Sequence, residues 1–214
     1  MYCYPEEIYD ELLYTMASCN KVVHYLDIPI QHASDKILKA MGRRTNRQQL
    51  SDVIGRIREI MPDISLRTSL ITGFPGETEE DVEILEQFVK EINFTRLGVF
   101  TYSKEDGTAA AKMKEQVPAR EKTKRRNRIM KLAKKMSFEN GRNLVGKTMQ
   151  VIVEGYIPDE DIYVGRTYMD APDIDGSIFL FSDERLMSGD VVTALVTGSE
   201  KYDLIGEVTG FEFA

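Results

Sequence analysis

A strand, a glycine-rich turn and the start of a helix follow one another in residues 65–81, and this stretch constrains the fold more than any other. Residues 66–71 are rich in strand formers. The Gly-Phe-Pro-Gly run at 73–76 ends the strand and allows the backbone to come close to a ligand. Thr78 and Asp81 have the spacing of a capping box. Ligands of α/β proteins bind at such strand ends, but the pattern is equally compatible with an ordinary strand-to-helix turn.

The order of the predicted elements indicates an incomplete parallel sheet. Apolar residues at helical spacing predict helices over 6–18, 34–41, 45–61 and 78–92, where Ser34 caps the second helix and Thr45 with Gln48 form a capping box for the third. Strands are predicted at 22–28, 65–72 and 96–102. Strands that alternate with helices predict a parallel sheet with right-handed crossovers. Three such strands are far fewer than the eight of a complete (β/α) barrel, so the sheet is expected to be the last part of a larger one.

A long basic helix is predicted over residues 118–143, which include nine Lys and Arg between positions 120 and 135. One interpretation is a nucleic-acid contact. The other is a solvated linker helix that packs on the sheet. We favour the linker, because Glu121 and Glu139 dilute the positive field and aromatic residues for stacking on bases are nearly absent.

The remaining residues have a different pattern and a different charge. Five short strands separated by glycines are expected at 151–153, 162–164, 178–181, 191–196 and 203–208. Such spacing predicts a small antiparallel barrel. Residues 1–143 have a net charge of +3 and residues 144–214 a net charge of −10, which favours units with different partners. We therefore predict three parts: 1–117, the linker helix 118–143, and 144–214.

Other features narrow the class of protein. The sequence has no apolar run of about 18 residues and no basic segment followed by an apolar one at its start, so neither a membrane span nor a signal peptide is expected. Cys3 and Cys19 stand too far apart for a compact metal motif. We expect a cytoplasmic protein with reduced thiols.

Three sequence motifs together resemble the methylthiotransferase branch of the radical S-adenosylmethionine enzymes. They are Tyr25–Ser34, Ile71–Thr78, and Phe100–Ser103 followed by Gly107–Ala110. Residues 118–135 are similar to the basic helix of this family, and residues 144–214 resemble its terminal TRAM barrel. The resemblance covers essentially the whole chain, and it implies that the first part is a piece of the radical enzyme barrel.

One branch of the family is favoured by the run Tyr168–Gly176, which resembles the signature of the RimO type. That branch methylthiolates an aspartate of a small-subunit ribosomal protein. Its tRNA-modifying relatives usually have Ser-Gly where this chain has His32-Ala33. An acidic barrel would also repel RNA phosphates and attract a basic ribosomal protein. A tRNA-modifying enzyme and a non-enzymatic module that docks basic partners are the alternatives.

The cysteines depart from the family pattern. The family holds one four-iron four-sulfur cluster with C-x-x-x-C-x-x-C and a second with three further cysteines, whereas this chain has two cysteines in all. Cys3 and Cys19 cannot supply three thiolates, so no metal ligand and no catalytic residue is assigned here. We therefore expect the chain to be the carboxyl-terminal part of a longer enzyme and to be inactive alone.

The resemblance implies roles for particular residues. S-adenosylmethionine is expected to contact Gln31, Arg67, Ile71, Thr72, Gly73, Phe100 and Tyr102. A buried arginine must be paired or must face a ligand, so an ion pair with Asp27 is the alternative for Arg67. His32 is expected to be structural.

Three acidic residues of the RimO-like run are predicted to contact the ribosomal protein: Asp170, Asp173 and Asp175. Their carboxylates would pair with Arg or Lys of that protein. The alternative is a solvated acidic turn, in which aspartate is common.

Overall fold

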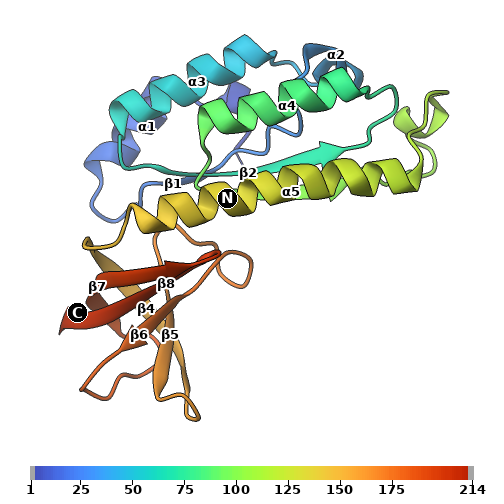
Figure 1. Cartoon of the computed structure of the whole chain (residues 1–214). Coiled ribbons are helices and arrows are strands. Elements are labelled where there is room, and N and C mark those ends of the chain that lie inside the picture. Colours follow the sequence, from blue (N-terminus) through green and yellow to red (C-terminus); the bar gives the residue numbers. More distant parts are fainter. Residues whose placement is uncertain (1–2, 212–214) are drawn as a thin grey trace. The chain divides into compact units, whose positions relative to one another are not determined.

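The computed structural model describes residues 3–211, which form two compact units that meet between residues 133 and 134 (Figure 1). The division falls inside the long helix that the sequence predicted as a linker. The predicted boundaries at 117 and 143 therefore stay a prediction. No helix within residues 3–211 is long and apolar enough to cross a membrane.

The first unit is a three-stranded parallel sheet with helices, as the sequence predicted. Its elements are η1 Pro5–Glu7, α1 Asp10–Ser18, β1 Tyr25–Asp27, α2 Asp35–Ala40, α3 Arg47–Ile60, β2 Ser65–Thr72, α4 Glu79–Ile92, β3 Arg96–Thr101, η2 Ala110–Lys112 and the first part of α5 Ala119–Arg142. The strand order is β1-β2-β3, and both pairings are parallel. The central strand β2 pairs with β3 in register from Arg67–Arg96 to Thr72–Thr101.

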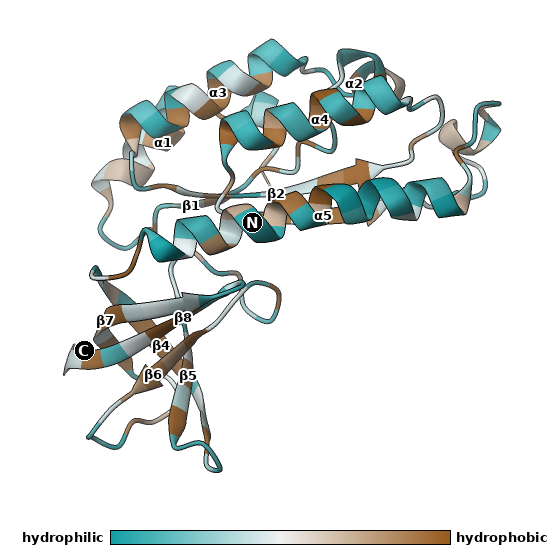
Figure 2. Ribbon diagram, viewed as in Figure 1, coloured by the Kyte–Doolittle hydropathy of each residue, from teal (hydrophilic) through white to brown (hydrophobic). Residues whose placement is uncertain are grey.

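The helices of the first unit bury apolar faces. In Figure 1, α3 and α4 run side by side along the sheet. Their fully buried side chains include Leu50, Ile57, Leu85 and Phe88, and the buried apolar residues of β2 complete this core. The beginning of α5 consists mainly of hydrophilic residues (Figure 2), and most of its basic side chains are exposed. Burial of such faces supplies the main stabilisation of amphipathic helices.

Two helix starts differ from the expectation. The capping box of α3 is formed by Asn46 and Gln49, one residue later than the predicted Thr45 and Gln48. Both pairs have the required spacing, but the N–H of the first helical residue, Arg47, donates to Asp35 Oδ1 at 2.7 Å, a partner supplied by the fold. The predicted helix 6–18 is also interrupted, because Ile8 and Tyr9 are extended between η1 and α1.

The second unit is a closed barrel of five strands, in agreement with the sequence. The strands are β4 Thr148–Ile157, β5 Ile162–Thr167, β6 Ile178–Phe181, β7 Val191–Glu200 and β8 Asp203–Phe211, in the order β4-β5-β6-β8-β7. Alternate residues such as Val151, Val153, Val192 and Ala194 point into one buried core.

One pairing of the barrel departs from the predicted antiparallel pattern, since β6 and β8 are parallel. The other four pairings are antiparallel. A closed ring with an odd number of strands cannot alternate direction at every step, so five strands require at least one parallel pair.

Candidate functional site

A pocket of about 520 Å³ lies at the carboxyl ends of the three parallel strands. Its lining residues are Gln31, Met41, Arg43, Ile71, Phe74, Phe100, Thr101, Tyr102 and Ser103. They come from the segment after β1, the turn after α2, the end of β2 with its turn, and the end of β3. This is the edge where ligands of parallel sheets bind. Four of the seven residues predicted to contact a cofactor are among them: Gln31, Ile71, Phe100 and Tyr102.

Gln31 is held in an unusual backbone conformation. Its φ is 70°, in the left-handed region that residues other than glycine rarely adopt. Its N–H donates to Ser69 O at 3.0 Å, and its carbonyl accepts from Ile71 N at 2.8 Å. These two bonds with β2 maintain the conformation and place Gln31 at the pocket. Strain of this kind is concentrated at functional sites.

Aromatic rings form one wall of the pocket. Phe74 and Tyr102 meet edge to face with ring centroids 5.2 Å apart. Lys122 Nζ lies 4.6 Å from the centroid of the Tyr102 ring and donates to Tyr102 O at 2.8 Å. Phe100 is 57% exposed although it lies within β3, next to its last residue. The exposed ring offers a flat apolar surface to a planar ligand.

Arg67 does not line the pocket. Its Nη1 lies 2.6 Å from Asp27 Oδ2, and both side chains are buried. The pair follows from the register, since Asp27 and Arg67 are neighbours across β1 and β2. The ion pair that the sequence left as the alternative is thus present, and a cofactor contact by Arg67 stays a prediction. The second Asp27 oxygen has no hydrogen-bond partner among the described residues.

Thr72 and Gly73 are not among the residues that line the pocket. Thr72 is fully buried. Gly73 has a φ of 75°, and a Cβ there would lie 2.3 Å from Lys122 Cγ, so the close approach predicted for a ligand is taken by a side chain of α5. The Gly73 N–H is also engaged, because it donates to both carboxylate oxygens of Glu77 at 2.9 Å. Contacts of these two residues with a cofactor stay a prediction.

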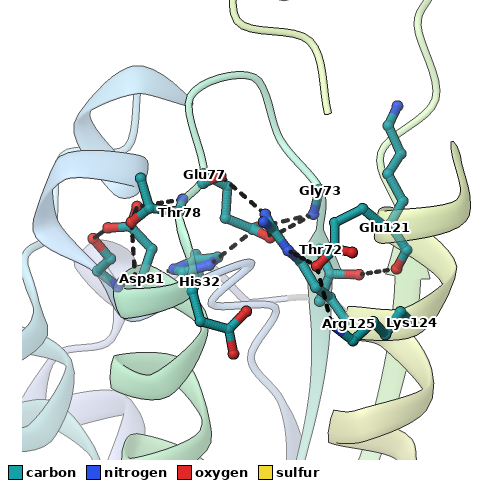
Figure 3. A network of polar contacts seen from close by, with 12 residues as sticks. His32, Thr72, Gly73, Glu77, Thr78, Asp81, Glu121, Lys124 and Arg125 are labelled. Atoms are coloured by element: carbon teal, nitrogen blue, oxygen red, sulfur yellow. Dashed lines mark hydrogen bonds and ion pairs between the residues drawn. The ribbon is translucent and has the colours of Figure 1, made fainter. Parts of the chain in front are cut away.

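Glu77 is the centre of a buried network that the sequence reasoning missed (Figure 3). Besides Gly73, its carboxylate accepts from Arg125 Nη1 at 2.9 Å, and His32 Nε2 lies 3.4 Å away. Burial alone would raise the pKa of Glu77, but the contacts with His32, Gly73 N–H and Arg125 lower it by more, so the pKa lies below its usual value. The ionised carboxylate therefore fixes the glycine turn to α5. Arg125 is 48 residues away, so local sequence patterns gave no signal for the pair.

His32 has a structural position in this network. It is fully buried, and its Nδ1 accepts a hydrogen bond from Ser34 N at 3.0 Å. A nitrogen that accepts a bond carries no proton, so the proton of a neutral ring resides on Nε2, which faces Glu77.

Asp81 joins the beginnings of α2 and α4. Its carboxylate accepts from Ser34 Oγ at 2.6 Å, Lys36 Nζ at 2.7 Å and Thr78 N at 2.8 Å. Burial would raise the pKa of Asp81, but the bonds from Lys36, Ser34 and Thr78 outweigh it and hold the pKa well below its usual range. The predicted capping box of α4 is confirmed. Ser34 is the N-cap of α2 as predicted, but its hydroxyl bonds Asp81 in place of its own helix.

A metal cluster does not fit the residues of this structure. No group of three or more His, Cys, Asp or Glu in the described part of the chain is arranged to hold a metal ion. Cys3 and Cys19 are both free thiols.

The acidic run of the barrel is divided between buried and exposed residues. Asp170 is only 5% exposed and accepts from Thr167 Oγ1 at 2.7 Å, which argues against direct contact with a partner. Asp175 accepts from Ala171 N at 2.9 Å and is half-buried. Asp173 is exposed. Further exposed carboxylates that the sequence reasoning did not single out lie in two loops, at Asp159, Glu160, Asp161, Asp183 and Glu184.

The two units match two known families. Residues 2–89 match the radical SAM superfamily, and residues 145–209 match the TRAM domain. Over 205 residues the chain is 56% identical to "Ribosomal protein uS12 methylthiotransferase RimO" of Lachnoclostridium phytofermentans. The aligned region covers 96% of this chain and 47% of that protein. The chain belongs to the RimO family of radical SAM proteins.

A second RimO relative, from Acetivibrio thermocellus, is 51% identical over 97% of this chain and 46% of its own length. The chain thus spans about half the length of the curated RimO relatives it matches. Among solved structures, the radical SAM enzyme coproporphyrinogen III oxidase (HemN) from Escherichia coli aligns with a TM-score of 0.51 over 65% of this chain and 32% of that chain. At 22% identity this likeness bears on the fold alone.

Proposed function

We propose that this chain provides the S-adenosylmethionine cradle and the TRAM domain of an enzyme that methylthiolates an aspartate of ribosomal protein uS12. The relatives carry that activity in their names. The observation that carries the proposal is the pocket. Gln31, Ile71 and Phe100, each predicted to contact the cofactor, come from three different strand ends and line one cavity.

The pocket has the properties that this cofactor requires. Its volume of about 520 Å³ is in the usual range of small-molecule sites, and its walls are largely apolar with a few polar groups. Phe100 and Ile71 would pack on the adenine ring, and the Gln31 amide would bond a polar group of the ligand. When bound, S-adenosylmethionine supplies the radical chemistry.

The iron–sulfur clusters of the family are assigned to no residue of this chain. Its two cysteines do not make a ligand set for a cluster. The role of these residues is therefore to bind and orient the cofactor and substrate, and we expect the chain alone to be inactive.

The barrel is proposed to recognise the basic ribosomal protein. Residues 144–214 have 14 Asp and Glu against 4 Lys and Arg. Exposed carboxylates in the two loops named above are available to Lys and Arg of a partner, together with Asp173. Such a surface repels RNA phosphates, which favours a protein over a tRNA. A ribosomal substrate also implies a cytoplasmic location.

Titration calorimetry of the 214-residue chain with S-adenosylmethionine tests the cradle. Wild-type protein is expected to bind, and Phe100→Ala to weaken binding about tenfold, because it removes an apolar wall of the pocket. Phe181→Ala is the control, since Phe181 is a comparably exposed phenylalanine of the barrel. Absence of binding, or equal affinities of the wild type and the Phe100 variant, would contradict the proposal.

A further inference from the structure

Arg43 is the one charged side chain among the nine residues that line the pocket. It follows α2 through a tight turn at Gly42, whose φ is 74°. The Arg43 N–H donates to Leu38 O at 2.9 Å, which fixes the backbone at this point. The side chain is half-buried, so its guanidinium belongs to the wall of the cavity and not to the free surface.

Two contacts hold the Arg43 guanidinium in place. Its Nη2 donates to the carbonyl oxygen of Pro29, which lies between β1 and Gln31. Its Cζ lies 5.0 Å from the centroid of the Tyr4 ring, a cation–π distance. These contacts use one of the five N–H donors and one face of the planar group. The guanidinium is thus positioned before a ligand arrives.

Arg43 also lacks a carboxylate partner within residues 3–211. Six other arginines there form ion pairs with Asp or Glu: Arg47, Arg56, Arg67, Arg125, Arg128 and Arg166. A half-buried guanidinium without a counter-charge is costly, and an anion that binds beside it recovers that cost. A positioned, unpaired arginine in a cavity therefore indicates an anionic ligand group.

We propose that Arg43 is the anion-recognition residue of this pocket and that it binds a carboxylate of the ligand. A carboxylate fits the fork geometry of one guanidinium. Phosphate sites usually add several backbone N–H groups, and here the Gly73 N–H is already bonded to Glu77. The apolar wall beside Arg43 suits the remainder of a ligand with a single anionic end.

Two ligands offer such a carboxylate, and the choice between them rests on the proposed function. One is the amino-acid end of S-adenosylmethionine, and the other is the aspartate side chain of the protein substrate. 5′-Methylthioadenosine lacks the first carboxylate. A peptide with asparagine in place of aspartate lacks the second.

Calorimetry of the 214-residue chain with these four probes tests the proposal. Arg43→Met is expected to lose about ten- to a hundredfold in affinity for the carboxylate probe that the pocket recognises, with no change for its carboxylate-free counterpart. Arg44→Met is the matched control, because it removes the same charge from the adjacent, exposed position. Arg43→Lys keeps the charge without the fork and should fall between the wild type and Arg43→Met. It also serves as the test variant if the methionine variant does not fold.

The outcomes separate this inference from the proposed function. If Arg43 and Arg44 variants bind carboxylate probes equally, or the wild type binds neither carboxylate probe, the inference is wrong. Arg43-dependent binding of the aspartate peptide without binding of S-adenosylmethionine would uphold the inference and contradict the cofactor cradle. Binding of S-adenosylmethionine that Arg43→Lys and Arg43→Met leave unchanged would uphold the cradle alone.

Discussion

At position 73, glycine meets a backbone requirement and a packing requirement together. The φ of 75° favours a residue without a Cβ, and the place that a Cβ would occupy is filled by the Lys122 side chain. Lys122 in turn reaches Tyr102, which lines the pocket. Gly73 is therefore connected to the pocket through its packing against Lys122 of α5.

Gly73→Ala is expected to lower the free energy of unfolding by about 2–4 kcal/mol, the sum of the left-handed backbone and the overpacking. Urea denaturation of the 214-residue chain measures this. Gly55→Ala is the control, because Gly55 lies within α3 with no atom within 4 Å of an added Cβ, and it should stabilise the protein by about 0.5–1 kcal/mol. Equal stabilities of the two variants would show that Lys122 does not pack as described.

Glu77 predicts a pH dependence of stability. Its pKa in the folded protein lies below the ordinary value of 4.5, so the unfolded chain binds a proton more readily. Its contribution to stability is therefore complete above about pH 4.5 and is lost as the pH falls through the folded pKa. Glu77→Gln should cost about 2–4 kcal/mol at pH 7, because it leaves Arg125 without its buried partner.

Urea denaturation at pH 7 and below pH 4.5 measures this difference. The gap between the wild type and Glu77→Gln should narrow at the lower pH, because Glu77 is protonated first in the unfolded chain and its contribution to the stability of the wild type is then lost. A gap that is constant with pH would mean that Glu77 is not ionised in the folded protein.

At the scale of elements, two carboxylates tie the turns that follow β1 and β2. Asp81 connects the segment before α2 with the start of α4, and Glu77 connects the glycine turn with α5. The strands place these turns side by side, but hydrogen bonds between distant residues fix their shapes. Gln31 and Phe74, which lie next to these anchored segments, line the pocket.

The two capping boxes of the first unit allow a test of whether Asp81 connects α2 with α4. Asp81 and Gln49 occupy the same third helical position, in α4 and α3 respectively. Gln49→Ala removes one exposed bond within its own helix and should cost about 1 kcal/mol. Asp81→Ala also leaves the buried Ser34 hydroxyl without its acceptor, so it should cost about 2 kcal/mol more. Thermal or urea unfolding of both variants compares them, and equal losses would mean that Asp81 serves α4 alone.

At the scale of the whole molecule, charge is divided between the two parts of the chain. The net charge is +3 over residues 1–143 and −10 over residues 144–214. Many basic side chains of the first unit are paired, such as Arg125 with Glu77 and Arg128 with Glu79. The exposed carboxylates of the barrel loops are the surface that we propose for the basic ribosomal partner.

Binding of purified uS12 in a salt series tests whether the exposed carboxylates of the barrel loops contact the partner. The double variant Asp159→Lys/Glu160→Lys should weaken binding about tenfold near 0.1 M salt, and the difference should shrink as salt screens the charges. Glu80→Lys/Glu83→Lys is the matched control, because it makes the same charge change on exposed residues of α4. Binding of tRNA by the wild-type chain, with no binding of uS12, would favour the tRNA alternative.

Local patterns in the sequence determined the elements and their class. Apolar periodicity, Gly-Phe-Pro-Gly and the Thr78–Asp81 box were enough for the parallel sheet, the turn and α4, because each signal resides within a few residues. The same holds for the five strands of the barrel, apart from the parallel pairing of β6 with β8, which ring closure imposes.

The tertiary structure decided which polar groups meet. It paired Arg67 with Asp27 and Glu77 with Arg125, and it left Arg43 in the pocket without a carboxylate partner among residues 3–211. The fold also buries Asp170, which the sequence pattern predicted to contact the ribosomal protein. The physical reason is that apolar periodicity depends only on neighbours along the chain. The partner of a buried charge depends instead on which distant segments the packing brings within hydrogen-bond reach.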